Sequence, residues 1–515
     1  MAKSRLFRST LIVSTMTMLS RILGLVRDVV LMGVFGAGGL MDAFLVAFKI
    51  PNFLRRLFAE GAFSQAFVPV LTEYKERQSL DEVRILISRV SGALLSILMT
   101  LTVIVITFAP VVTKLFAPGF GGEQFDMASL LLRLTFPYLL LISMTAFLGS
   151  ILQSYGRFAM PAFAPVLLNL SMIAGALIVA PLLSTPIMAL GYAVVVAGIL
   201  QMAIQLPELF KERLLTPPKI DFKHEGVRRI LTLMLPAIFG VSVTQINLLL
   251  NTVFASLMMS GSVSWLYAAE RLSELPLGLI GVAIGTVILP SLSSSIAKTD
   301  ESGFRQTLDW AAKLIILVGL PASVAMFVLS DTLMITLFVR REFTHQDALM
   351  SAIALKSMAG GILGFMLIKI FAPAFFARQD TKTPVKIGIV AVFANMLFSV
   401  LFIGVFHWFG LPLHGGLALA TTAASFVNAG LLYYFLHKRG IWQFGNHWLK
   451  MIGQFGLSAT AMASSLYVLL PYFPAHSSEW LRVSALLGLC VVGALVYAAV
   501  LLATGFRPRQ LKHGN

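Results

Sequence analysis

The sequence predicts an all-α polytopic membrane protein with about fourteen transmembrane helices. Of its 515 residues, 58% are hydrophobic and only 12% are charged, whereas soluble domains are nearer half apolar and a quarter charged. The apolar residues form continuous runs of about 20 residues or more, the length at which a helix crosses roughly 30 Å of hydrocarbon. Such runs are far longer than the roughly ten residues of a membrane β-strand. Most charged residues lie in short connectors between the runs.

The apolar runs locate the expected spans to within a few residues. The first span is expected to be a retained helix and not a cleaved signal peptide, because Arg21, Arg27 and Asp28 interrupt its apolar stretch. The second span is polar in its middle. In chain order, the expected spans are 9–35, 40–70, 86–116, 127–153, 160–182, 186–208, 227–258, 264–292, 306–338, 347–376, 384–406, 411–436, 448–472 and 480–504.

Lysine and arginine are concentrated in alternate connectors. Basic connectors of membrane proteins stay in the cytoplasm, so both termini are expected to be cytoplasmic. Arg340 and Arg341 are the clear exception, since their connector belongs to the opposite set. The formal charge is +16, but its scattered distribution indicates orientation in a membrane and no nucleic-acid partner. The basic connectors contain Lys75, Arg77, Arg84, Arg157, Lys211, Arg213, Lys219, Lys223, Lys298, Arg378, Lys382, Lys438 and Arg439.

The connectors are too short to fold as separate domains, so the expected organisation follows the spans. We expect an N-terminal lobe of six spans at 1–210 and a basic cytoplasmic linker at 211–226. A second lobe of six spans follows at 227–440, and 441–515 adds two further spans and a cytoplasmic C-terminus. Both lobes would begin and end in the cytoplasm, as in transporters built from parallel repeats.

The sequence lacks the motifs that indicate ATP hydrolysis, disulfide bonding or metal binding. There is no G-x-x-x-x-G-K-[ST] phosphate-binding motif, so the chain is expected to carry no ATPase of its own. The single cysteine, Cys490, excludes a disulfide within the chain. The eight histidines show no metal-binding spacing. We therefore expect no cofactor, no metal ion and no covalent catalysis.

Charged residues inside the expected spans are the most informative feature of the sequence. A lysine or arginine at the centre of a span costs about 2.5–3.5 kcal/mol on insertion scales, and such residues usually face a partner, a cavity or a ligand. Internal ion pairs are one explanation, because Arg271 and Glu274 share a helix face at a spacing of three. The in-span charges are Arg21, Arg27 and Asp28 in span one, Asp42, Lys49, Arg55, Arg56 and Glu60 in span two, and Glu270, Arg271 and Glu274 in span eight.

Ion pairs leave an excess of positive charge. Excess cations in a membrane require water or an anionic ligand, and the planar fork of arginine matches phosphate geometry. A cavity with several arginines therefore favours a phosphate-bearing substrate. Pro51, within span two, removes one backbone donor and indicates either a simple kink or a hinge that lines a cavity. This excess comes from counting only part of the in-span charges, without Asp28, Glu270 and Glu274. The counted residues are six cations and two anions, namely Arg21, Arg27, Lys49, Arg55, Arg56 and Arg271 against Asp42 and Glu60.

These charged segments also carry a family resemblance. They are similar to the MurJ (MviN) family of lipid II flippases of Gram-negative bacteria, which belongs to the MOP exporter superfamily. The resemblance implies fourteen helices in two six-helix lobes with a V-shaped central cavity, and a groove at the last two helices for a polyprenyl tail. The matching blocks are MTMLSRILGLVRD (16–28), GAGGLMDAFLVAFKIPNFLRRLFAEGAFSQAFVPV (36–70), FPYLLLISMTAFLGSILQSYGRFAMPAFAPVLLN (136–169) and SGSVSWLYAAERLSELPLG (260–278).

The resemblance also implies roles for individual residues. Asp42, at the periplasmic start of span two, matches a functionally important family acid, and Ser264 matches a cavity-gate position opposite the short first loop; both belong to the expected gate or cavity support. One departure concerns sodium, which some relatives bind with an acid on span seven, where this chain has amides but no carboxylate. A sodium site is therefore not expected. The implied contacts to the diphosphate and sugar head group are Arg21, Arg27, Arg55 and Arg271, and further gate or cavity support comes from Asp28, Lys49, Pro51, Glu60 and Glu274.

The expected function is therefore lipid transport. The chain would flip the undecaprenyl-diphosphate-linked peptidoglycan precursor, lipid II, from the cytoplasmic to the periplasmic leaflet of the inner membrane by alternating access. Its expected partners are lipid II, membrane lipid and other cell-wall synthesis proteins. Another transporter of the superfamily, a drug antiporter or a polysaccharide-unit flippase, is the alternative, although a cationic-drug exporter would want an acidic cavity. A membrane glycosyltransferase would want a catalytic carboxylate or a sizeable domain outside the membrane.

Overall fold

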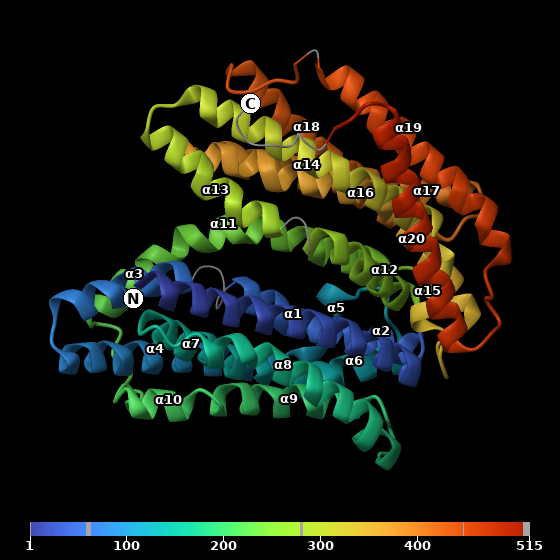
Figure 1. The fold of residues 1–515 in the computed structure, drawn as a ribbon. Helices are drawn as coiled ribbons and strands as arrows, with labels where there is room; N and C mark the ends of the chain where they lie inside the picture. The colour runs from blue at the N-terminus through green and yellow to red at the C-terminus, as the bar shows by residue number, and fades with distance from the viewer. Residues whose placement is uncertain (1, 58–62, 279–281, 446, 508–515) are drawn as a thin grey trace. The chain divides into compact units, whose positions relative to one another are not determined.

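The computed structural model describes residues 2–57, 63–278, 282–445 and 447–507, and within these ranges its regular elements are helices (Figure 1). Each of the fourteen expected spans corresponds to one helix or to a run of consecutive helices. Within the same ranges, ten spans are long and apolar enough to cross a membrane. The other four expected spans coincide with α1, with α2 and α3, with α11, and with α12 and α13. The predicted all-α polytopic membrane fold is confirmed.

The helices follow one another with short connections. The first set consists of α1 (Ala2–Phe35), α2 (Gly39–Arg55), α3 (Ser64–Arg77), α4 (Leu80–Thr107), α5 (Ala109–Phe116), α6 (Gly122–Thr135), α7 (Pro137–Ser154), α8 (Ala159–Ala174), η2 (Gly175–Val179), η3 (Ala180–Leu182), α9 (Met188–Ala203), α10 (Leu206–Lys211) and α11 (Glu225–Ser256). The second set consists of α12 (Ser262–Pro276), α13 (Val282–Ala297), α14 (Glu301–Val328), α15 (Ser330–Phe338), α16 (His345–Ala377), α17 (Lys382–Trp408), α18 (Leu413–Lys438), α19 (His447–Leu469), η5 (Leu470–Tyr472) and α20 (Glu479–Ala503).

The chain forms two compact units. Unit 1 contains residues 1–264 together with 340–342, and unit 2 contains residues 265–339 and 343–515. The expected lobe boundary at the 211–226 linker therefore differs from this division, because α11 packs with α3 and α4 of unit 1. The division by compactness does not test the proposed six-span lobes, which remain a prediction.

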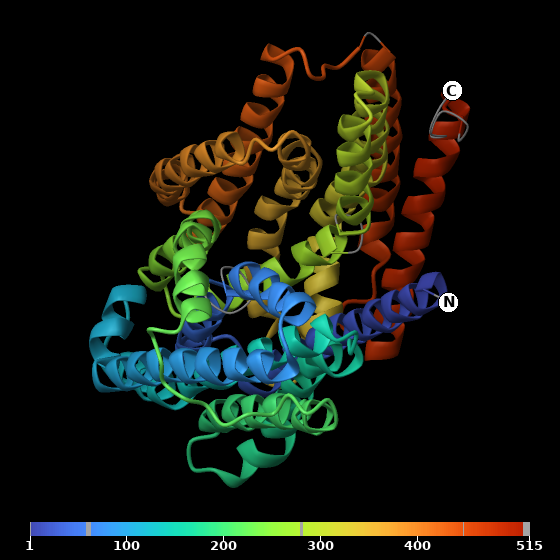
Figure 2. The same ribbon diagram turned by 90° about the vertical axis from the view of Figure 1, so that its left-hand side faces the viewer.

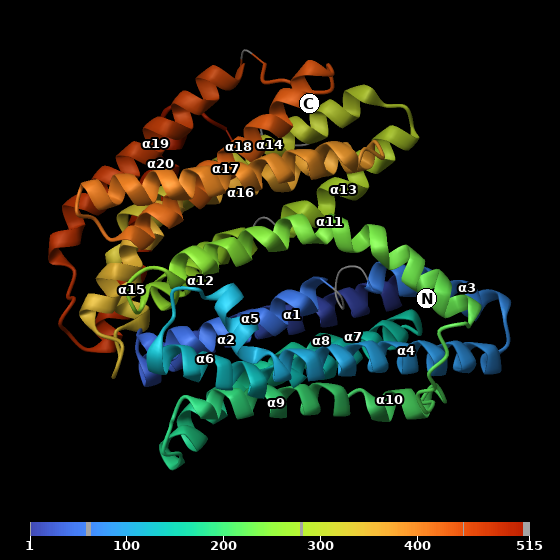
Figure 3. The same cartoon turned by 180° about the vertical axis from the view of Figure 1, so that it is seen from behind.

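Unit 1 is a bundle in which α1 packs along α8, α2 along α6, and α9 along both α7 and α8 (Figures 1 and 3). Part of its core lies where α3 meets α7, with the rings of Phe67 and Phe147 fully buried and 5.0 Å apart. The α4 helix begins at a polar cap, because the Ser79 side chain accepts a hydrogen bond from the Glu82 amide. Such caps satisfy amides that a helix leaves without intrahelical partners.

The basic linker crosses α4 as an extended segment. Figure 2 shows it as a thin green trace that passes over the blue helix. The Lys219 amide donates to the Ser88 carbonyl (2.9 Å), and the Ser88 hydroxyl donates to the Pro217 carbonyl (2.6 Å). Gly92 lies under the crossing, where a Cβ atom would come within 2.2 Å of the Lys219 carbonyl oxygen. The linker is thus a fixed strap on α4, and only glycine allows so close an approach.

Unit 2 is built around α16, which packs against α14 and α18. A capping box starts α16, since the side chains of Thr344 and Asp347 each bond the other residue's backbone amide. Small residues bring α16 and α18 together: a Cβ added at Gly364 would lie 2.4 Å from the Ser425 hydroxyl oxygen. In the same unit, the buried Arg482 anchors α20 to α15. Its guanidinium donates to the Ile335 and Val339 carbonyls at the C-terminal end of α15.

Candidate functional site

Arg27 is buried inside unit 1 and its guanidinium is held in place by two neighbours. Its Nε and Nη2 atoms donate to Oδ1 of Asp28 (2.9 and 2.6 Å), and its Nη1 donates to Oδ1 of Asn169 on α8 (3.1 Å). The Asn169 amide also donates to the Ser20 carbonyl of α1 (3.0 Å), so one side chain fixes both the helix and its arginine. Buried charged groups inside a membrane protein are tolerated when they are paired and hydrogen-bonded.

Replacing Asp28 with alanine is expected to destabilise unit 1 strongly. The side chains of Arg27 and Asp28 are 6% and 2% exposed, and removing one partner of a buried pair costs about 3–5 kcal/mol because it leaves an uncompensated charge. Thermal unfolding of the purified variant measures the loss. Combining Asp28→Ala with Arg27→Ala should recover part of it.

The exposed pair between Asp81 and Arg84, 3.2 Å apart on α4, is the matched control. Asp81→Ala should cost less than about 1 kcal/mol, because water screens exposed ion pairs. Equal losses for the Asp28 and Asp81 variants would contradict a structural role of the buried pair.

The remaining predicted cations of unit 1 differ in their surroundings. Arg21 is exposed on α1, directly after Ser20, which accepts the Asn169 hydrogen bond, while Lys49 and Arg55 are half-buried on α2. Arg27 and Arg21 are six residues apart and therefore point in different directions around α1. The structure thus places three arginines on two helices of one unit, with only Arg27 fully enclosed. The predicted Glu60 lies outside the described residues.

Pro51 does not break α2, which continues to Arg55. Proline has no amide to donate to the carbonyl four residues earlier, that of Ala47. The hydroxyl of Thr135 on α6 donates to this carbonyl instead (3.3 Å). A side-chain hydroxyl thereby satisfies the backbone group that the proline leaves free, as membrane helices require. Pro51 is therefore accommodated inside the continuous helix α2.

Asp42 is the most completely enclosed of the predicted acids, at 1% exposure. Its Oδ2 accepts a hydrogen bond from the Gly261 amide (2.7 Å). Its Oδ1 accepts from the amide and the hydroxyl of Ser264 (2.8 and 2.5 Å). Gly261 directly precedes α12 and Ser264 lies in its first turn, so the carboxylate caps the start of that helix and faces its positive dipole end. The sequence did not predict this contact between Asp42 and Ser264, which lies within unit 1.

Arg271 lies on α12 in unit 2 and is held by residues of its own helix. Its Nη1 donates to Oε2 of Glu274 (3.1 Å), and its Nε and Nη2 lie 3.2 and 3.1 Å from the Tyr267 hydroxyl. The guanidinium is 35% exposed and Glu274 is 60% exposed. The predicted i,i+3 ion pair between Arg271 and Glu274 is therefore present, and both of its side chains are partly exposed.

Two partners of the arginines were not predicted. Asn169 orients Arg27, and Tyr267 orients Arg271. The only sequence signal for Asn169 was an amide within an apolar span, which is costly unless it is hydrogen-bonded. Tyr267 stands four residues before Arg271, a spacing that brings two side chains together on a helix.

An apolar groove of about 450 Å³ lies between α14, α19 and α20 in unit 2. Pro321, Met462, Leu466 and Gly493 contribute to its walls. Tyr497 closes one side, and its hydroxyl donates to the Leu317 carbonyl (3.0 Å). A groove with so few polar groups at membrane depth suits a hydrocarbon chain.

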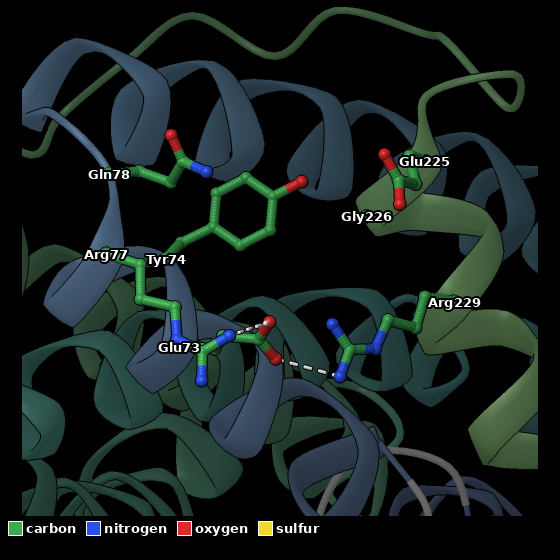
Figure 4. Close-up of a pocket in the computed structure, with 7 residues that line it drawn as sticks. All are labelled: Glu73, Tyr74, Arg77, Gln78, Glu225, Gly226 and Arg229. Carbon is green, nitrogen blue, oxygen red and sulfur yellow. Dashed lines mark ion pairs between the residues drawn. The ribbon is translucent and has the colours of Figure 1, made fainter.

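A smaller, polar pocket of about 120 Å³ lies where the end of α3 meets the start of α11 (Figure 4). Glu73 pairs with Arg229 (2.8 Å) and with Arg77 (3.6 Å), and the Tyr74 ring lies between Gln78 and the start of α11. The hydrogen bond from Arg229 lowers the pKa of the exposed Glu73 carboxyl. Water screens such surface pairs, so they contribute little to stability.

Comparison with known proteins identifies the family. The family model described as "Lipid II flippase MurJ" matches residues 31–490. A protein of Haemophilus influenzae named "Probable lipid II flippase MurJ" is 44% identical, covering 97% of this chain and all of that protein. A protein of the same name from Vibrio cholerae is 43% identical, covering 99% of this chain and 98% of that protein. The chain therefore spans essentially the whole length of these relatives.

Solved structures agree with the family at the level of the fold. A structure described as "Lipid II flippase MurJ, inward closed conformation" superposes with a TM-score of 0.80 at 26% identity, covering 95% of this chain and 98% of that one. A multidrug resistance MATE transporter of the MOP superfamily superposes with a TM-score of 0.66 at 17% identity, covering 83% of this chain and 97% of that one. This second likeness concerns the fold alone. Because both the family model and the full-length relatives match, the chain belongs to the MurJ family of lipid II flippases, which are membrane transporters and not enzymes.

Proposed function

We propose that this multi-pass membrane protein moves lipid II from the cytoplasmic to the periplasmic leaflet by alternating access. The supporting observation is its 44% identity, over nearly the whole chain, to a protein named as a probable lipid II flippase. The arginines within its spans support an anionic substrate and argue against export of cationic drugs, for which an acidic cavity is expected. No covalent step is needed, because the head group only changes leaflet.

In this proposal Arg21, Arg27, Arg55 and Arg271 contact the diphosphate and the adjoining sugar. Arginine suits this role because its fork donates two parallel hydrogen bonds to phosphate oxygens. Arg27 is already oriented by Asp28 and Asn169, which supports a preformed position. Lys49 on α2 would add positive charge near Arg55, and Glu60 and Pro51 would support the gate or the cavity.

The proposed organisation assigns the parts of the substrate to different parts of the chain. Residues 1–210 and 227–440 would be the two lobes that rock during transport, joined by the 211–226 linker. Residues 441–515 would take the polyprenyl tail, a role supported by the apolar groove beside α19 and α20. Other cell-wall synthesis proteins would supply lipid II on one side of the membrane and consume it on the other.

The leaflet in which lipid II accumulates tests the function. Cells depleted of this protein should accumulate lipid II in the cytoplasmic leaflet, where a periplasmic probe for its peptide or sugars cannot reach it. Re-expression should move the pool to the periplasmic leaflet. Accumulation in the periplasmic leaflet after depletion would contradict the proposed direction.

The proposed orientation in the inner membrane places both termini and the linker in the cytoplasm, because lysine and arginine favour that side. Cysteine introduced at Gly121 should react with a membrane-impermeant maleimide in intact cells, in a background that carries Cys490→Ser. A Cβ at Gly121 meets no atom within 4 Å, so the substitution should be tolerated. Cysteine at the exposed Lys219 should react only after cells are opened. The reverse pattern would invert the topology.

A further inference from the structure

A second apolar groove, of about 270 Å³, lies in unit 1 between α4 and α11, far along the chain from the proposed tail groove. Two of its side chains, Ile97 and Leu235, are 44% and 62% exposed, so the groove is open along its length. Among the described residues that line it, Phe63 contributes the one aromatic ring. The lining residues are Phe63, Val90, Ala93, Leu94, Ile97, Leu98, Leu101, Val227, Ile230, Leu231, Met234, Leu235 and Ile238.

The length of the groove matches one leaflet of a membrane. Along α4 it extends from Val90 to Leu101, eleven residue steps of about 1.5 Å, or roughly 16 Å. Half of a hydrocarbon layer of about 30 Å is roughly 15 Å. An acyl chain of one leaflet therefore fits along it, whereas an undecaprenyl tail is several times longer than one leaflet is deep.

One end of the groove is basic. Arg89 shares a face of α4 with Ala93 and Ile97, at spacings of four and eight residues, and Arg228 lies at the same end of α11, three residues before Leu231. The strap adds the exposed Lys219, whose amide is fixed to α4 by the Ser88 carbonyl.

The positive charge at this end is only partly neutralised. Arg89 lies 3.6 Å from the Asp221 carboxylate. Neither Lys219 nor Arg228 has an acidic partner within 4.0 Å among the residues that the structure describes. Both side chains are exposed at the level where α4 and α11 leave the apolar region. A phosphate at this position would complete the charge balance.

We propose that this groove and its basic end bind one anionic phospholipid. One acyl chain lies between α4 and α11, and the head-group phosphate is held by Lys219, Arg228 and Arg89. The orientation proposed above puts this lipid in the cytoplasmic leaflet, where anionic lipids and basic protein segments attract each other. Because the lipid contacts α4, α11 and the strap together, it stabilises their packing in unit 1.

Native mass spectrometry of the full chain in detergent tests the head-group contacts. Dioleoylphosphatidylglycerol should be retained more tightly than dioleoylphosphatidylcholine, which has the same chains and no net charge. The double variant Lys219→Gln, Arg228→Gln should bind phosphatidylglycerol roughly 30-fold more weakly, since each basic residue contributes a factor of about five at an anionic lipid surface. The control double variant Lys438→Gln, Lys450→Gln removes two exposed cations of unit 2 and should leave this affinity unchanged.

A second pair of variants tests the groove itself. Ile97→Trp places a larger ring over the groove at a side chain that is 44% exposed, and should displace the lipid without overpacking a core. Ile389→Trp changes a similarly exposed position (41%) on α17 and should have no effect. In thermal unfolding, added phosphatidylglycerol should stabilise the wild type and the Ile389 variant but not the Ile97 variant.

Three results would overturn the proposal. The first is equal retention of the two phospholipids by the wild type. The second is an equal loss of phosphatidylglycerol in the unit 2 control. The third is displacement of phosphatidylglycerol by an equimolar amount of undecaprenyl phosphate, which would assign the groove to the transported lipid.

Discussion

Replacing Arg271 with alanine is expected to leave a protein that reaches the membrane in near-normal amount but no longer supports growth. The guanidinium is only partly buried, so its removal strands no enclosed charge. Its loss removes a charge-assisted contact worth about 1.5–3 kcal/mol, which corresponds to roughly a 10- to 100-fold lower rate of flipping. Growth of depleted cells, together with the amount of protein in purified membranes, measures both quantities.

Two further variants separate substrate binding from ion pairing at Arg271. Arg271→Lys keeps the charge but loses the bidentate fork, so partial function is expected. Arg271→Ala combined with Glu274→Ala removes both members of the 3.1 Å pair and should remain inactive. Restored growth in that double variant would show that Arg271 serves mainly to neutralise Glu274. The substrate-binding proposal for Arg271 would then be withdrawn.

Replacing Asp42 with alanine is expected to lower both stability and function. The carboxylate accepts three hydrogen bonds from Gly261 and Ser264, at 2.5–2.8 Å. Without it, two backbone amides at the start of α12 and one hydroxyl lose their acceptor inside the protein. Each unsatisfied buried group costs about 1–3 kcal/mol, so a total of at least roughly 3 kcal/mol is expected, a large part of the 5–15 kcal/mol that stabilises a typical protein.

Ser264→Ala is the matched comparison for Asp42. It removes one hydroxyl donor and leaves the two amide hydrogen bonds to Asp42 intact, so a cost of about 1.5–3 kcal/mol is expected. Thermal unfolding of the purified variants should therefore rank the wild type first, Ser264→Ala second and Asp42→Ala last. An Asp42→Ala protein with wild-type unfolding that still fails to support growth would show that the carboxylate acts on the substrate and not as a helix cap.

The connector that contains Arg340 and Arg341, the exception to the charge pattern, packs against unit 1. Arg340 and Arg341 are basic residues in a connector that should carry few, yet residues 340–342 cluster with unit 1 and not with their chain neighbours. The Glu342 amide donates to the Gly33 carbonyl at the end of α1 (3.0 Å). Gly36, with φ of +69°, passes so close that a Cβ would lie 2.9 Å from the Glu342 carbonyl oxygen. This connector is therefore constrained by packing as well as by charge.

The sequence alone determined the membrane fold, the approximate limits of its helices and the family. Apolar runs long enough to cross a bilayer leave few alternatives to helices, because every backbone group must be hydrogen-bonded within its own segment. The family followed from blocks in spans one, two and eight and from the block at 136–169. The sequence also predicted the Arg271–Glu274 pair, because helical spacing alone brings those side chains together.

Only the tertiary structure decided which partners surround the other charges. Arg27 meets Asn169 across 142 residues of chain, and Asp42 meets Ser264 across 222. No local periodicity encodes such contacts, because they depend on how separate helices pack. The groove between α4 and α11 and the strap fixed beside it are likewise products of packing. Helix formation in a membrane is local, whereas pairing between helices depends on the shape and polarity of surfaces that the fold brings together.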